Sequence, residues 1–187
     1  KVYVTTFCGV AVAMNIVLGI ITSALGIPLY LDTLGTVLSA AILGPVPGII
    51  VGALSNIITG LIYSVSDIPF CLVNMAVGLI VGLVAKKVAK INESTDKKYV
   101  FKWSVIASIA GLAFNVIADP IVGYFYKQYI LGQPQELAQA LAKMSAAATF
   151  INAVVSVILV AIIYNAVRPV LIKSHLITVT NNKNQVA

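Results

Sequence analysis

Charge-free apolar runs of roughly 20 residues are the feature that most constrains this chain, because runs of that length form transmembrane helices. Of the 187 residues, 60% are hydrophobic and only 10% are charged, whereas soluble domains carry about 25% charged residues. A transmembrane β-barrel would show short alternating segments instead. We therefore predict one domain, an all-α integral membrane bundle. The net charge of +6 is interpreted as a topology signal, and no nucleic-acid partner is expected.

Turn residues between the apolar runs predict six transmembrane helices. Asp119-Pro120 and Arg168-Pro169 are expected to end the fifth and sixth of them, because proline interrupts a helix. An amphipathic helix is predicted over residues 134–144, before the last span. The charged stretch 86–102 reads as a solvated loop. The expected spans cover about 4–25, 31–43, 48–63, 69–86, 103–119 and 145–167.

The second span is too short to cross a bilayer. Its apolar part, Thr33 to Leu43, has about 11 residues and a length of roughly 17 Å as a helix, whereas the hydrocarbon core is about 30 Å thick. Either residues 29–32 extend the span at an angle, or it is a half-helix enclosed by protein.

The distribution of charge predicts the orientation. Six spans place both termini on one side, and that side holds ten of the twelve Lys and Arg residues, leaving only Lys127 and Lys143 opposite. By the positive-inside rule both termini are cytoplasmic. The acids that fall on the outer side are Asp32, Asp67, Asp119 and Glu136.

Polar side chains gather at the predicted outer ends of the spans, as a small polar ligand requires. Asp32 and Thr36, and likewise Asn115 and Asp119, are four residues apart and share a helix face. Asp32 either contacts the ligand or braces the first outer loop, and Lys127 is a candidate partner for it. The predicted substrate-binding residues are Asp32, Thr36, Asn56, Tyr63, Asp67, Asn74, Asn115, Asp119, Thr149 and Asn152.

Each of these asparagines also has a packing interpretation, because an amide in a membrane helix often bonds a neighbouring helix, at about 0.6 kcal/mol. For Asn15, deeper in the first span, packing is the favoured interpretation. Cys8 and Cys71 lie in apolar runs without metal-ligand spacing and are interpreted as small buried hydrophobes. We expect no metal site and no cofactor.

The sequence contains no catalytic Ser/His/Asp set, no nucleophile elbow, no H-E-x-x-H pair and no P-loop. The chain is therefore not expected to be an enzyme or to hydrolyse ATP. A membrane protease is the best enzymatic alternative, but paired acids at mid-depth are missing.

The stretch Leu31-Asp32-Thr33-Leu34-Gly35-Thr36, followed by Leu43-Gly44-Pro45 with Gly48, Gly52 and Asn56, resembles the S-components of energy-coupling factor (ECF) vitamin transporters. Within that group it is most similar to the branch assigned to pyridoxine or hydroxymethylpyrimidine. The resemblance covers nearly the whole chain. It implies a multi-pass protein of a bacterial cell membrane that binds one vitamin in an outward-facing pocket.

The resemblance also implies partners. An S-component docks through its first three helices onto a membrane coupling (T) subunit, which two cytoplasmic ATPases drive, and the whole S-component topples to release its ligand inside. Small residues of the first span form the family's docking contact. The nearest matches here are Gly9, Ala11 and Ala13.

Two transport functions follow from these observations. The first is an S-component for a small water-soluble vitamin, with a single ring preferred because the outer loops are short. The alternative is a stand-alone, proton-coupled secondary transporter of a small heterocycle, working through Asp32 or Asp119. Inverted repeats would favour the alternative, and the two halves show no convincing one.

Overall fold

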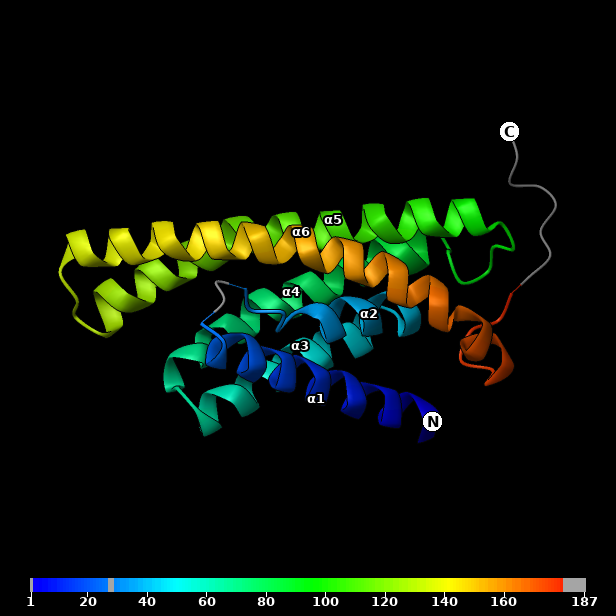
Figure 1. Ribbon diagram of the computed structural model, residues 1–187, viewed down its shortest axis with the longest axis horizontal. Coiled ribbons are helices and arrows are strands. Elements are labelled where there is room, and N and C mark those ends of the chain that lie inside the picture. Colours follow the sequence, from blue (N-terminus) through cyan, green and yellow to red (C-terminus); the bar gives the residue numbers. More distant parts are fainter. Residues whose placement is uncertain (1, 27–28, 180–187) are drawn as a thin grey trace.

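The computed structural model describes residues 2–26 and 29–179, and these residues form an all-helical bundle (Figure 1). Five helical segments are long and apolar enough to cross a membrane, and α2 is shorter. Three short segments of 3₁₀ or π type adjoin the α-helices: η1 (Val65–Phe70), η2 (Leu83–Val88) and η3 (Tyr126–Ile130). The α-helices are α1 (Val2–Ala24), α2 (Leu34–Leu43), α3 (Pro45–Ile62), α4 (Cys71–Gly82), α5 (Lys97–Phe125) and α6 (Gln135–Lys173).

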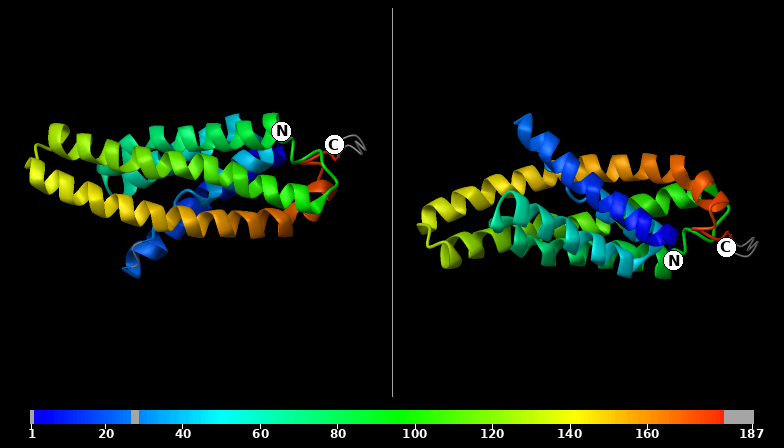
Figure 2. Two further views of the ribbon diagram at one scale, coloured as in Figure 1. Left: turned by 90° about the horizontal axis from the view of Figure 1, so that it is seen from above. Right: turned by 90° about the horizontal axis from the view of Figure 1, so that it is seen from below.

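The two longest helices, α5 and α6, run antiparallel and side by side along the molecule (Figures 1 and 2). In the view of Figure 1, α4 and α2 lie beneath α5 and α6, and α3 and α1 lie below those helices. Helix α1 crosses the bundle obliquely (Figure 2). The start of α1 and the end of α6 lie at the same end of the molecule.

The two ends of the bundle differ in charge. The basic end holds the η2–α5 loop and the start of α1, and its charged residues include Lys86, Lys87, Lys90, Lys97, Lys98, Lys102, Arg168 and Lys173. Lys1 and Lys183, also counted in the topology prediction, lie outside the described residues. The acidic end holds the α1–α2 loop, η1 and the α5–α6 turn, with Asp32, Asp67, Asp119 and Glu136.

Helix α2 is enclosed by protein, which decides between the two alternatives for the second span. It has 10 residues, nine of them buried, and contacts α1, α3, α4, α5 and α6. Terminal N–H and C=O groups of a helix need partners, and asparagines of other segments supply them. Asn15 Oδ1 accepts from the Gly35 N–H at 2.6 Å, and Asn92 Nδ2 donates to the Ile42 carbonyl at 2.8 Å. A half-helix can therefore persist at membrane depth.

Glycines allow α3 and α4 to pack with their backbones in contact. Gly48 faces Gly78, where an added Cβ on Gly48 would lie 2.9 Å from the Gly78 carbonyl oxygen. One turn along α3, Gly52 faces the Asn74 backbone, and Gly82 faces Pro45 at the start of the helix. Such four-residue spacing of small residues is the usual way for membrane helices to approach closely.

Several predicted boundaries are wrong. Helix α5 continues through Asp119-Pro120 to Phe125, and α6 continues through Pro169 to Lys173. The predicted amphipathic helix 134–144 is the beginning of α6, and not a separate element before a span that starts at residue 145. Prolines are tolerated here because neighbouring helices in a membrane bundle compensate the lost hydrogen bond. The solvated loop was predicted over 86–102, but the observed loop covers only residues 89–96. The lysines on either side of it belong to η2 and α5.

Candidate ligand-binding site

Three carboxyl groups from separate elements lie within electrostatic range of one another at the acidic end. Asp32 lies in the α1–α2 loop, outside the membrane-spanning helices, while Asp67 belongs to η1 and Asp119 to α5. Burial and then the Asp119 carboxyl raise the pKa of Asp32 from 3.8 to about 7, with a smaller contribution from Asp67 and opposition from the hydrogen bond to its own N–H. Burial, followed by the same three acids, raises the pKa of the neighbouring Tyr30 phenol. We define these residues, Tyr30, Asp32, Asp67 and Asp119, as the acid cluster.

Asp119 is well provided with hydrogen bonds. Its Oδ2 accepts from Ser145 Oγ at 2.8 Å and from Thr149 Oγ1 at 3.0 Å, both on α6. Lys127, two turns further along, is near enough to stabilise the negative charge of Asp119. The predicted candidate partner of Asp32 therefore lies beside a different acid of the same cluster. Asp119 also links α5 to α6 and so positions the site.

The first loop of the acidic end is braced by residues other than Asp32. Asn152 Oδ1 accepts from the Leu31 N–H at 2.8 Å, and its Nδ2 donates to Thr33 Oγ1 at 3.3 Å. Thr22 Oγ1 donates to the Tyr30 carbonyl at 3.1 Å. No hydrogen bond from another described residue reaches the Asp32 carboxyl, which leaves that group available to a ligand.

Asn115 differs from the other asparagines of the candidate site. Its side chain is only 4% exposed, and its amide makes no hydrogen bond with any residue that the structure describes. It lies one turn before Asp119 on the same face of α5. The amide can therefore offer a donor and an acceptor to a ligand at this position.

Asn56 and Asn74 bond each other between α3 and α4. Asn74 Nδ2 donates to Asn56 Oδ1, and Asn56 Nδ2 donates to the Asp67 carbonyl at 3.4 Å. These amides therefore hold η1, and with it Asp67, against the bundle. Their placement fits the packing interpretation while still connecting them to the acid cluster.

Two predicted residues lie apart from the cluster. Thr36 is fully buried and accepts from Asn15 Nδ2 at 3.0 Å, and the same nitrogen donates to Ser55 Oγ at 3.0 Å. Asn15 thus joins α1, α2 and α3, as its packing interpretation predicts. Tyr63, at the end of α3, is 59% exposed.

An apolar groove of about 510 Å³ is lined by residues that follow two of the acids in sequence. It begins two residues after Asp67 and two residues after Asp119 in sequence, and it is lined by Pro69, Ile121, Val122, Phe125, Tyr126, Tyr129 and Ile130. The rings of Phe125 and Tyr129 are stacked, with centroids 5.7 Å apart. Such aromatic faces can stack against a ring.

A second polar cluster, at the basic end, was missed by sequence reasoning. Tyr164 Oη donates to Asn92 Oδ1 at 2.6 Å, and Arg168 Nη2 donates to the carbonyls of Ile91 and Ser94. These bonds tie the η2–α5 loop to α6. The four-residue spacing of Tyr164 and Arg168 within an apolar helix was the available signal.

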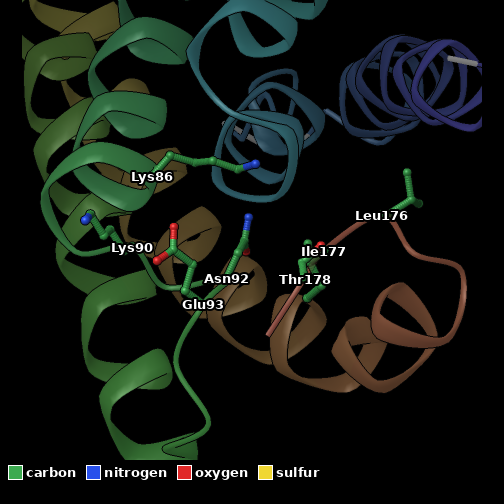
Figure 3. A pocket seen from close by; sticks show the side chains of 7 residues that line it. All are labelled: Lys86, Lys90, Asn92, Glu93, Leu176, Ile177 and Thr178. Atoms are coloured by element: carbon green, nitrogen blue, oxygen red, sulfur yellow. The ribbon is translucent and has the colours of Figure 1, made fainter. Parts of the chain in front are cut away.

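Beside this cluster is a pocket of about 280 Å³ (Figure 3). Lys86, Lys90 and Glu93 border it on one side, and the segment after α6 closes the other side with Leu176, Ile177 and Thr178. The Lys86 chain also lies against the α2–α3 turn, where an added Cβ on Gly44 would be 3.5 Å from its Cδ. This pocket shares no residue with the acid cluster.

Other residues of the acid cluster's surroundings were also not predicted. The sequence offered no reason to assign Ser145 or Thr22 to the site, because single hydroxyl groups in apolar helices usually bond their own backbone. Among the described residues, no group of three or more His, Cys, Asp or Glu side chains could hold a metal ion, and Cys8 and Cys71 are free thiols. The site can thus offer carboxyl, amide and aromatic contacts to an organic ligand.

Comparison with known protein families gives one match. A family model described as "ECF-type riboflavin transporter, S component" matches residues 1–169. Searches of curated proteins and of solved structures give no match.

Proposed function

The chain belongs to the ECF-type riboflavin transporter S-component family, and we propose that it captures a small water-soluble vitamin and delivers it through an ATP-driven importer. The observation that carries this proposal is the acid cluster, together with Asn115 one turn before Asp119 on α5, whose amide bonds no described residue. It provides polar contacts for a ligand at one end of a membrane bundle whose sequence contains no ATP-binding motif.

We assign the predicted site residues to two roles. Asp32, Asp67, Asn115 and Asp119 contact the vitamin, with Tyr63 at the entrance. The remaining residues hold these groups in place: Asn152 fixes the loop of Asp32, Thr149 fixes Asp119, and the pair Asn56 and Asn74 fixes η1. Thr36 acts from a distance, by anchoring α2 to Asn15.

Pyridoxine or hydroxymethylpyrimidine is the ligand that we propose first. Carboxyl and amide groups suit a small nitrogen heterocycle with hydroxymethyl substituents, which offers several donors. Riboflavin, which the family description names, is the second candidate. Its larger ring system would extend into the apolar groove.

The proposed partners are a membrane coupling (T) subunit and two cytoplasmic ATPase subunits in a bacterial cell membrane. Gly9 and Ala13 are exposed on one face of α1, and nothing described lies within 4 Å of a Cβ added to Gly9. Ala11, in contrast, is 3% exposed and its backbone contacts Gly35 of α2. Our docking proposal therefore rests on Gly9 and Ala13.

Vitamin binding and transport test this function separately. The protein purified in detergent should bind pyridoxine, hydroxymethylpyrimidine or riboflavin in isothermal titration calorimetry, and mass spectrometry should identify the same compound as a co-purifying molecule. Liposomes with this chain alone should not accumulate the vitamin, whereas liposomes that also contain the T subunit and ATPases should do so with ATP. Accumulation by the chain alone in a pH gradient would contradict the proposal and indicate the secondary transporter.

A further inference from the structure

The acid cluster carries more negative charge than the surrounding protein compensates. Asp119 of α5 and Asp67 of η1 act electrostatically on Asp32, and among the described residues the cation that acts on the cluster is Lys127, near Asp119. On α6, Ser145 and Thr149 bond Asp119, and Asn152 bonds the Leu31 N–H next to Asp32. All three side chains are uncharged. Of the ionisable groups next to Asp32, Tyr30 is neutral at physiological pH.

Hydrogen bonding distinguishes Asp119 from the other two acids. Asp119 accepts two bonds from α6, whereas the carboxyls of Asp32 and Asp67 receive none from another described residue. Asn115, 96% buried by its 4% exposure, likewise has no hydrogen-bond partner in the described part of the chain. The Asp32 carboxyl and the Asn115 amide, which lies one turn before Asp119 on α5, are therefore both available to a ligand.

We propose that Asp32 selects a vitamin with a basic ring nitrogen, which shares one proton with the Asp32 carboxyl while Asn115 bonds a second polar substituent. This inference rests on the proposed function and specifies the chemistry of the same site. A pyridine or aminopyrimidine ring meets the requirement, because its nitrogen forms a charge-assisted bond with a carboxylate. The neutral isoalloxazine ring of riboflavin has no such basic nitrogen. A divalent cation is disfavoured, since the described acids form no metal-binding group.

The shared proton determines how binding depends on pH. Below about pH 7 the Asp32 carboxyl of the free protein already holds a proton, so a neutral ring and the protonated acid together contain the one proton that the complex needs. Above that pH the proton must be taken from solution. Affinity should then fall by up to about tenfold per pH unit.

Calorimetry with the intact protein in detergent tests this inference with pyridoxine and with its benzene analogue, in which CH replaces the ring nitrogen. Pyridoxine should bind at least about tenfold more tightly than the analogue at pH 6, and its affinity should decrease between pH 7 and pH 9. In Asp32→Asn, pyridoxine should bind at least about tenfold more weakly and the pH dependence should flatten.

Glu136→Gln is the matched control, because Glu136 is an exposed acid at the same end of the molecule. It should retain wild-type affinity and pH dependence. Equal affinity for pyridoxine and its benzene analogue overturns the inference without using any variant. Binding of riboflavin alone, unchanged in Asp32→Asn, also overturns it but leaves the S-component function standing. If none of the three vitamins binds, both proposals fail.

Discussion

Asparagine side chains within the helices have two different environments. Asn15 makes three hydrogen bonds to groups of α2 and α3, whereas Asn115 is equally buried and makes none with the described residues. The first arrangement stabilises the free protein, and in our proposal a ligand completes the second. Identical residue types in apolar helices therefore serve structure in one place and, in our proposal, recognition in another.

Replacing Asn15 by Leu should lower the free energy of unfolding by about 2 kcal/mol, since three bonds of about 0.6 kcal/mol each are lost. Thermal unfolding in detergent measures the change. Asn165→Leu is the control, because Asn165 donates only to Ala161 of its own helix. An unchanged Tm in Asn15→Leu would show that the three bonds do not hold α1 to its neighbours.

Asp32 should make the stability of the ligand-free protein depend on pH. Its pKa is about 7 in the fold and 3.8 ordinarily, so between these values the folded state binds more protons than the unfolded state. The free energy of unfolding should therefore decrease as pH rises from about 4 to about 7. The difference in Tm between wild type and Asp32→Asn, measured across this range, isolates the effect. Parallel curves for the two proteins would contradict the placement of Asp32.

At the scale of helices, the contact between α3 and α4 depends on residues without side chains. Gly48 and Gly78 bring the two backbones together, and Gly52 and Gly82 repeat the contact one turn away on each side. This face positions Asn56 and Asn74 to bond each other, and through them it holds η1. The packing of two helices thus positions one acid of the candidate site.

Gly78→Val should destabilise the protein by about 1–3 kcal/mol, because its branched side chain would collide with the Gly48 backbone. Chemical or thermal unfolding in detergent gives the magnitude. Gly9→Ala adds a methyl group where nothing described lies within 4 Å, and it should leave stability unchanged or raise it. Equal stability of the two variants would argue against a tight α3–α4 contact.

Over the whole molecule, the acid cluster and most of the basic residues lie at opposite ends. Helix α1 crosses the side of the bundle (Figure 2) and exposes apolar residues such as Val10 and Val17. This separation fits our proposal that binding and docking use different surfaces. The second polar cluster, formed by Asn92, Tyr164 and Arg168 at the basic end, holds the loop that follows η2. The acid cluster is held from the same helix, α6, through Asn152.

Ala13→Leu should block assembly with the T and ATPase subunits while preserving vitamin binding, because Ala13 is exposed on α1. Co-purification with tagged ATPase subunits and calorimetry measure the two properties. Ala11→Leu is the informative comparison, since Ala11 packs at the α1–α2 contact and its replacement should lower Tm. Normal assembly of Ala13→Leu would exclude this face of α1 from docking.

The proposed orientation can be checked by labelling intact cells with a membrane-impermeant maleimide. In a Cys8→Ala, Cys71→Ala background, Gln133→Cys in the α5–α6 turn should react from outside. Lys98→Cys at the basic end should react only after the cells are opened, because the basic end is expected to be cytoplasmic. The reverse pattern would invert the topology.

The sequence by itself determined the class of fold, because long charge-free runs can satisfy their backbone in a membrane only as helices. It also indicated the family, the segregation of charge and the packing role of Asn15. The sequence did not predict where α5 and α6 end. Whether Pro120 or Pro169 ends a helix depends on how the neighbouring helices pack, and here both helices continue past their prolines. Only the tertiary structure showed that α2 is a half-helix enclosed by other helices. Asn15 and Asn92, from distant segments of the chain, bond the backbone groups at its two ends. Only the tertiary structure distinguished Asn152, which braces a loop, from Asp32 and Asn115, which remain unpaired.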